Sequence, residues 1–208
     1  MNIFKLFQTI LLIIFSVNFI SGQTEYVNEI YSGQTKKYST KYNEKSHGLN
    51  LTIKYPQSWR EIEGNRPHSL VKLNAPEKSN MVLILITELD EEMSQSDIKG
   101  YFADDYLKSI VVEIGGTYLS SNSNLKIDGL KAASYDYYLT NQQMSKSFTM
   151  YSRNYIFFYK RYYIQIQCSV GNDEDNTYKI SNLNDYFNSY LQLFELIVNS
   201  TVIVNQWE

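Results

Sequence analysis

Two segments of the chain repeat apolar residues at the spacing of an α-helix, and a run of strand-like segments lies between them. The first helical segment covers about residues 96–114 and ends at Gly115-Gly116. The second covers about residues 183–198 and follows Asn182, a residue type that often caps helices. Alternating apolar and polar residues predict strands between the two helices, over residues 124–127, 132–140, 146–153, 155–159 and 162–170. Some connectors are too short for parallel crossovers, so this order predicts an α+β fold with an antiparallel β-sheet flanked by helices.

The part of the chain before the first helix adds three more strands to this plan. Residues 49–55 alternate apolar and polar side chains, and we expect a half-buried strand there. Trp59 follows it and is expected to cover the end of the core. Residues 69–73 and 81–87 are the next predicted strands; the second is apolar at consecutive positions, which favours a place inside the sheet. The polar residues 60–68 between them contain a glycine and a proline and predict a loop.

The first 22 residues have the layout of a secretory signal peptide. A short basic start is followed by an apolar run over residues 6–20 and then by small residues, so cleavage is expected after Gly22. A retained signal anchor is the alternative. Residues 23–45 are polar, show no sustained period and predict a flexible lead-in, which leaves residues 46–208 as one domain. These features predict a secreted or periplasmic protein with no membrane span in its mature part.

Charge and cysteine content narrow the class of protein further. The chain has 19 Lys and Arg against 22 Asp and Glu, a net charge of −3, so there is no basic surplus for nucleic acid. Its single cysteine, Cys168, excludes an internal disulfide framework. Cys168 falls on the apolar side of the predicted strand 162–170, and we therefore expect it to be buried rather than catalytic.

The sequence offers few residues for catalysis or metal binding. His47 and His68 are the only histidines, and neither has a second histidine or a cysteine at helical or hairpin spacing. Both are predicted to be solvated loop residues, and no metal or cofactor is expected. No nucleophile elbow, phosphate-binding glycine loop or dinucleotide-binding fingerprint occurs.

Several features together resemble the PsbP-like family, over about residues 45–204. They are the strand that ends in Tyr55-Pro56 with Trp59 beyond it, the loop 63–68, the glycine-terminated middle helix, the tyrosine-rich strands and the final amphipathic helix. The resemblance implies an α-β-α sandwich and a non-enzymatic, extracytoplasmic role in binding or assembly. In photosynthetic members that role is to stabilise the oxygen-evolving side of photosystem II. This is not carried over, because the chain has a bacterial-type secretory signal and no specific binding residue can be matched.

We therefore predict a non-enzymatic binding or assembly module whose partner is another exported or envelope protein or a small ligand. The expected contact residues are Arg60, Glu63, Arg66 and His68, because Pro67 restricts the loop that carries them. Alternatively, the loop only closes one end of the sheet. A second alternative is a hydrolase-type enzyme with an unrecognised site, in which Arg66, His68 and a nearby carboxylate act together.

Overall fold

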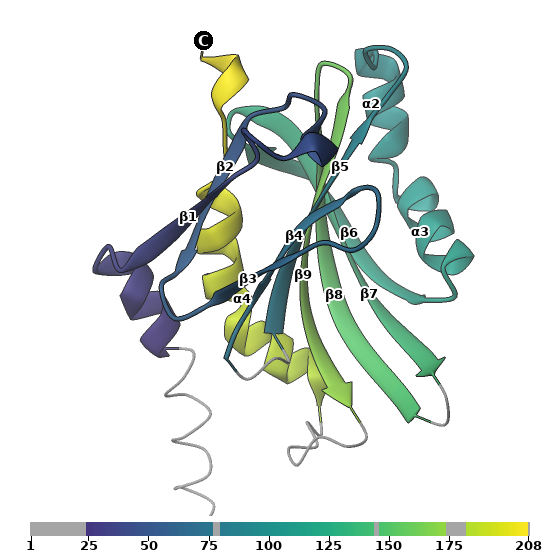
Figure 1. Cartoon of the computed structure of the whole chain (residues 1–208). Helices are drawn as coiled ribbons and strands as arrows, with labels where there is room; N and C mark the ends of the chain where they lie inside the picture. The colour runs from purple at the N-terminus through teal and green to yellow at the C-terminus, as the bar shows by residue number, and fades with distance from the viewer. Residues whose placement is uncertain (1–23, 77–79, 144–145, 174–181, 208) are drawn as a thin grey trace, which may run out of the picture.

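The computed structural model describes residues 24–76, 80–143, 146–173 and 182–207. Its main element is a seven-stranded sheet in which every pair of neighbouring strands is antiparallel (Figure 1). In order across the sheet, its strands are β3 (Arg60–Glu63), β4 (Ser69–Asn74), β5 (Asn80–Glu88), β9 (Tyr162–Asp173), β8 (Lys146–Tyr159), β7 (Leu130–Gln143) and β6 (Thr117–Ile127). The predicted α+β class and antiparallel pairing are confirmed.

A second, smaller sheet was not predicted. In this sheet, the central strand β2 (Leu51–Pro56) pairs with β1 (Thr35–Ser39) on one side and with β10 (Val202–Ile203) on the other. The expectation of a single sheet is therefore wrong. Alternation along β2 is real, since Leu51, Ile53 and Tyr55 are buried, but alternation alone does not say which sheet a strand joins.

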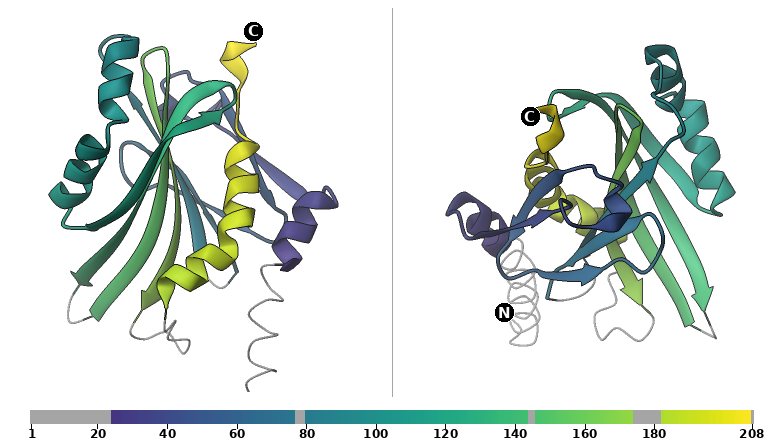
Figure 2. Two further views of the ribbon diagram at one scale, coloured as in Figure 1. Left: turned by 180° about the vertical axis from the view of Figure 1, so that it is seen from behind. Right: turned by 45° about the horizontal axis from the view of Figure 1, so that its top comes forward.

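Helices cover both faces of the large sheet. One face carries α4 (Leu183–Asn199), which lies between the large and small sheets, whereas α2 (Gln95–Tyr101) and α3 (Asp104–Glu113) lie on the other face (Figure 2). Short 3-10 helices cover Glu44–Ser46 and Val204–Gln206. Among the described residues, no helix combines the length and apolar character that a membrane span requires.

The predicted middle helix is two helices, α2 and α3. Ser94 caps α2 by accepting a hydrogen bond from the backbone N–H of Asp97. Gly115 follows α3 with a φ of 75°, as expected from the glycine pair at the end of the predicted helix. The break falls at Ala103, whose ψ of 138° is extended. Neither glycine nor proline occupies this position, so the sequence carries no local signal for the break.

Two hydrophobic cores lie on the two faces. On β8, Tyr155 and Phe157 belong to the larger core with α4, whereas Ile156 and Phe158 belong to the smaller core with α2 and α3. Successive residues of a strand point to opposite faces, so this division shows that the helices sandwich the sheet. The larger core also contains Trp59 and Cys168, both 0% exposed, which confirms that these side chains are buried.

The lead-in is not the unstructured segment that its composition predicts. Residues 24–31 are helical, and β1 follows them. Tyr26 and Val27 are buried, and the ring of Tyr26 meets that of Trp59 edge-on at 6.0 Å. This segment is held by contacts with distant residues, which local composition does not reveal. The predicted signal peptide lies outside the described residues.

Candidate interaction surface

The predicted contact segment begins as a strand. Residues 60–63 form β3, the last strand of the large sheet, so the prediction of a loop is wrong for these four residues. All four side chains are exposed, and an edge strand exposed on both faces has no apolar alternation from which it could be recognised. Glu61 accepts a hydrogen bond from the hydroxyl of Tyr55 in β2, so Glu61 and Glu63 point toward the small sheet. Arg60 and Ile62 point to the opposite face.

Gly64 fixes how the chain leaves this strand. A Cβ atom at this position would lie 2.1 Å from the carbonyl oxygen of Ser69, so no larger residue fits without a shift of the backbone. The N–H of Gly64 donates to the carbonyl of Leu70 at 3.1 Å. Hydrogen-bonded and non-hydrogen-bonded pairs alternate along an antiparallel ladder. The backbone N–H and C=O groups of Glu61 and Glu63 therefore point away from β4, toward the open edge.

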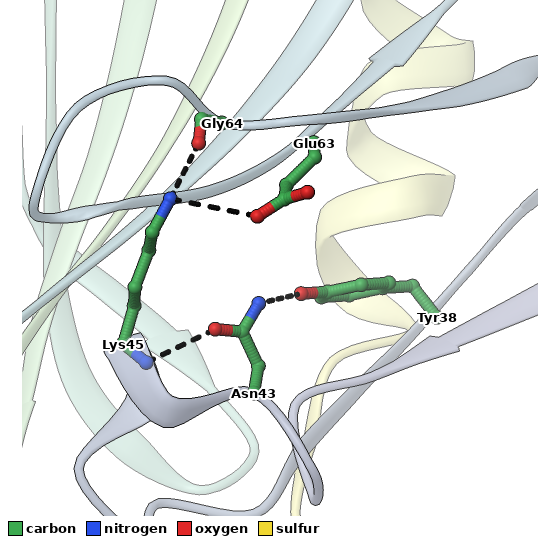
Figure 3. A network of polar contacts seen from close by, with 5 residues as sticks. All are labelled: Tyr38, Asn43, Lys45, Glu63 and Gly64. Atoms are coloured by element: carbon green, nitrogen blue, oxygen red, sulfur yellow. Dashed lines mark hydrogen bonds and ion pairs between the residues drawn. The ribbon is translucent and has the colours of Figure 1, made fainter.

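A polar network connects the end of β3 to the small sheet (Figure 3). The Nζ atom of Lys45 donates to the carbonyl of Gly64 at 2.5 Å and lies 3.8 Å from Oε1 of Glu63. The backbone N–H of Lys45 donates to Oδ1 of Asn43 at 3.0 Å, and the amide nitrogen of Asn43 donates to the hydroxyl of Tyr38 at 3.1 Å. Lys45 thus donates a hydrogen bond to the carbonyl of Gly64, just beyond the strand, and places its positive charge near the carboxylate of Glu63.

Local sequence explains why Lys45 lies there. Asn43 is the N-cap of the 3-10 helix, and its side chain holds the backbone of Lys45. His47 follows with a φ of 51° and Gly48 with a φ of 88°. These two left-handed residues turn the chain into β2, which places the short helix over the end of β3.

A surface hollow of about 490 Å³ surrounds this network. Its lining residues are polar or aromatic: Tyr38, Ser39, Tyr42, Asn43, Glu44, Lys45 and Glu63. Tyr42 is 90% exposed, with the ammonium group of Lys41 5.5 Å from the centre of its ring. Burial raises the pKa of Tyr38, which the carboxylates of Glu61 and Glu63 raise further, while the hydrogen bond from Asn43 opposes them. The hydroxyl of Tyr38 therefore stays protonated and can donate as well as accept.

The structure separates the four predicted contact residues. Glu63 lies in the network, and Arg60 lies on the other face of β3. Arg66 and His68 are exposed in the turn to β4, where their backbone carbonyls accept hydrogen bonds from the N–H groups of Ser69 and Ile86. Within the described ranges, no ion pair joins Arg66 or His68 to a carboxylate, and no cluster of three metal-binding side chains forms.

His47 differs from its prediction. Its Nδ1 atom lies 3.3 Å from Oε2 of Glu88, and the other oxygen of that carboxylate pairs with Arg161. It is therefore a paired residue rather than a freely solvated one. The partner is distant in sequence, which explains why spacing along the chain missed it.

Sequence reasoning also missed Tyr38, Asn43 and Lys45, because all three fall in the segment predicted to be flexible. One local signal was available: Asn43 precedes Glu44 in the order typical of a helix start. Nothing in the sequence indicates that Lys45 meets Gly64 and Glu63, since that contact joins the 3-10 helix to an edge strand that is not its neighbour in the chain.

No family model matches this chain, and neither does any curated protein sequence. Among solved structures, the chain is similar to a crystal structure from Bacteroides thetaiotaomicron VPI-5482, with 12% identity and a TM-score of 0.45. That match covers 84% of this chain but only 50% of the Bacteroides chain. This chain is also similar to LpqN, described as involved in cell envelope biogenesis of Mycobacterium tuberculosis, with 10% identity and a TM-score of 0.48. That match covers 85% of this chain and 95% of the LpqN chain.

Proposed function

We propose that this chain is an exported binding module that captures an extended segment of a partner protein by pairing it with β3. The observation that carries the proposal is the open edge of β3, where the N–H and C=O groups of Glu61 and Glu63 face outward. Unpaired groups of this kind are a template for an added strand, and such pairing is a recurrent mode of peptide recognition.

The surroundings of β3 suit the recognition of side chains on the added strand. On one face, Lys45 and Glu63 present opposite charges at the mouth of the hollow that contains Tyr42. On the other face, Arg60 and Ile62 offer a cation and an apolar side chain, with Ile62 47% exposed. A bound strand alternates its side chains between these two faces, so each face would contact every second residue of the partner segment.

The edge is also held in shape before binding. Gly64 closes tightly against Ser69, and Lys45 fixes the carbonyl that follows the strand. An edge that is already ordered loses less conformational freedom when a partner binds.

We further propose that the mature protein acts outside the cytoplasm, and by binding rather than catalysis, as the resemblance to the PsbP-like family implies. The signal-peptide pattern of residues 1–22 supports export. Incubating the mature protein with ester, peptide and glycoside substrates tests the non-enzymatic part. Turnover that is abolished by His68→Ala would favour the hydrolase alternative.

A matched pair of variants at Glu63 tests strand addition. Glu63→Pro removes an outward N–H group that β4 does not use, whereas Glu63→Thr removes the same carboxylate but keeps the N–H. In pull-downs from the native envelope fraction, the proline variant should lose the proteins that the wild type recovers. The threonine variant, which loses only the carboxylate, should recover clearly more of them than the proline variant. If the proline variant folds and recovers the same proteins, β3 is not the docking edge.

Charge reversal at both arginines tests the predicted contact residues separately. Arg60→Glu with Arg66→Glu should weaken recovery of the partner without changing the far-ultraviolet circular dichroism spectrum, because both side chains are exposed. If the folded double variant recovers the partner as well as the wild type does, Arg60 and Arg66 do not contact it, and the part of the segment that carries them is only a connector.

A further inference from the structure

A second hollow lies on the far side of the molecule, between the helices α2 and α3 and the edge strand β6. Its volume is about 650 Å³, which falls in the range of small-molecule sites. Two groups among its lining side chains bear on what it could bind. Ile98, Phe102 and Leu125 supply apolar surface, and Lys99, Lys126 and Lys131 supply positive charge.

Two irregularities of the backbone open this hollow. The first is the break at Ala103, which separates α2 from α3 and brings Ala103 itself to the wall. The second is a bulge in β6. The pairing moves from Asn122 opposite Ser134 to Leu125 opposite Ala132, so β6 holds one more residue than β7 over this stretch. The residues inside the bulge, Ser123 and Asn124, also line the hollow. Bulges commonly re-aim side chains beside binding sites.

The apolar part of the hollow is only partly covered. Phe102 is 6% exposed and packs in the smaller core, while Ile98 and Leu125 remain half-buried against the two cores. The helix α2 contains no fully buried residue, so its apolar side is not fully used by packing against the sheet. An apolar group placed in the hollow would bury more of this surface, and that burial favours binding.

Among the described residues, none of the three lysines forms an ion pair with a carboxylate. All three are exposed, and Lys131 reaches the side-chain oxygen of Gln95, at 3.4 Å. The acidic residue on the wall, Asp104, accepts hydrogen bonds from the hydroxyls of Tyr118 and Ser121 instead. Three like charges around one hollow repel one another, and a bound anion relieves that repulsion.

We infer that this hollow binds a free, single-chain anionic amphiphile of the fatty-acid class. Its apolar chain lies on Ile98, Phe102 and Leu125, and its carboxylate lies among Lys99, Lys126 and Lys131. Charge complementarity selects the anionic head, and the apolar surface selects the chain. This site is separate from β3, so it does not depend on the proposed capture of a partner protein.

Isothermal titration of the mature protein with decanoate tests the inference, with acetate and decan-1-ol as the head-only and chain-only probes. Decanoate should bind at one site, and each of the other two should bind at least about tenfold more weakly. Lys126→Glu with Lys131→Glu should weaken decanoate binding by at least about tenfold, since charge-assisted contacts are lost and repulsion is added. The matched control is Lys37→Glu with Lys54→Glu, an exposed pair on the small sheet, which makes the same change in net charge and should leave binding unchanged.

A blocking variant tests the place of binding without altering charge. Ser123 is exposed on the wall, so Ser123→Trp should fold normally and abolish decanoate binding by filling the hollow. Four results would overturn the inference: no decanoate binding, equal binding of acetate or decan-1-ol, decanoate binding that survives both the lysine reversal and the tryptophan, or sedimentation with phosphatidylglycerol vesicles in place of decanoate binding. The last result would indicate a membrane surface as the anionic partner.

Discussion

Asp136 on β7 and Arg153 on β8 form an ion pair beside aromatic side chains of the larger core. Breaking this pair should strongly destabilise the protein. The Nε atom of Arg153 lies 2.7 Å from Oδ1 of Asp136, and its Nη2 atom lies 2.8 Å from Oδ2. The Asp136 side chain is 6% exposed and that of Arg153 is 21% exposed. The guanidinium also lies 5.7 Å from the centre of the Phe187 ring on α4. The pair therefore joins β7 and β8 where α4 packs.

The two single variants should differ in magnitude because the two side chains differ in exposure. Arg153→Met leaves the nearly buried carboxylate without a partner and should lower the free energy of unfolding by about 4 kcal/mol. Asp136→Asn leaves the cation, which water reaches more easily, and should lower it by about 3 kcal/mol. In the double variant neither charge remains, so its loss should be smaller than the sum of the two single losses by about 2–3 kcal/mol.

Urea unfolding followed by circular dichroism measures all four proteins of this cycle. Ser120→Ala is the control, because it removes only a hydroxyl 3.2 Å from Asp136 and should cost under about 1 kcal/mol. Additive losses in the double variant, or a loss below about 1 kcal/mol in either single variant, would refute the reasoning that the pair is buried and coupled.

Two further predictions concern buried ionisable groups. Cys168 is 0% exposed and burial raises the pKa of its thiol, so a thiol reagent should label it only at the rate of unfolding. Cys168→Ala should lower the free energy of unfolding in urea by about 1 kcal/mol. Rapid labelling of the folded protein would contradict burial. Burial also raises the pKa of Tyr135 from 10.0 to about 12. The unfolded chain then loses this proton more readily than the folded one above pH 10, so the free energy of unfolding should fall between pH 10 and 12, and Tyr135→Phe should make that fall shallower. An equal fall in the variant would show that Tyr135 does not contribute.

The elements that sequence predicts best are those whose signals are local. The helix expected over residues 183–198 is α4, Leu183–Asn199, because Asn182 caps it and its apolar stripe faces a core on one side. By contrast, β8 was divided at Asn154 although it runs unbroken from Lys146 to Tyr159. The polar residues Arg153 and Asn154 interrupt the apolar pattern, but Arg153 finds its partner on the neighbouring strand, which no local pattern shows.

The candidate interaction surface could be located only in part from the sequence, for a related reason. Its position near residues 60–68 came from a polar, proline-containing stretch, and Glu63 does lie in the network. Its other half, Lys45 with Asn43, lies between β1 and β2 of the small sheet, whose third strand, the distant β10, also pairs with β2. Contacts of such long sequence separation have no periodic signature in the chain.

That pairing also bears on when the protein can fold. Ile203 is fully buried opposite Leu51, and the carbonyl of Asn205 accepts a hydrogen bond from the hydroxyl of Tyr159 at 2.9 Å. The small sheet, and the core that it closes over α4, cannot be completed until residues 202–205 have left the ribosome. Because this pairing joins residues that are far apart in the sequence, closure of the small sheet should be a slow step of folding.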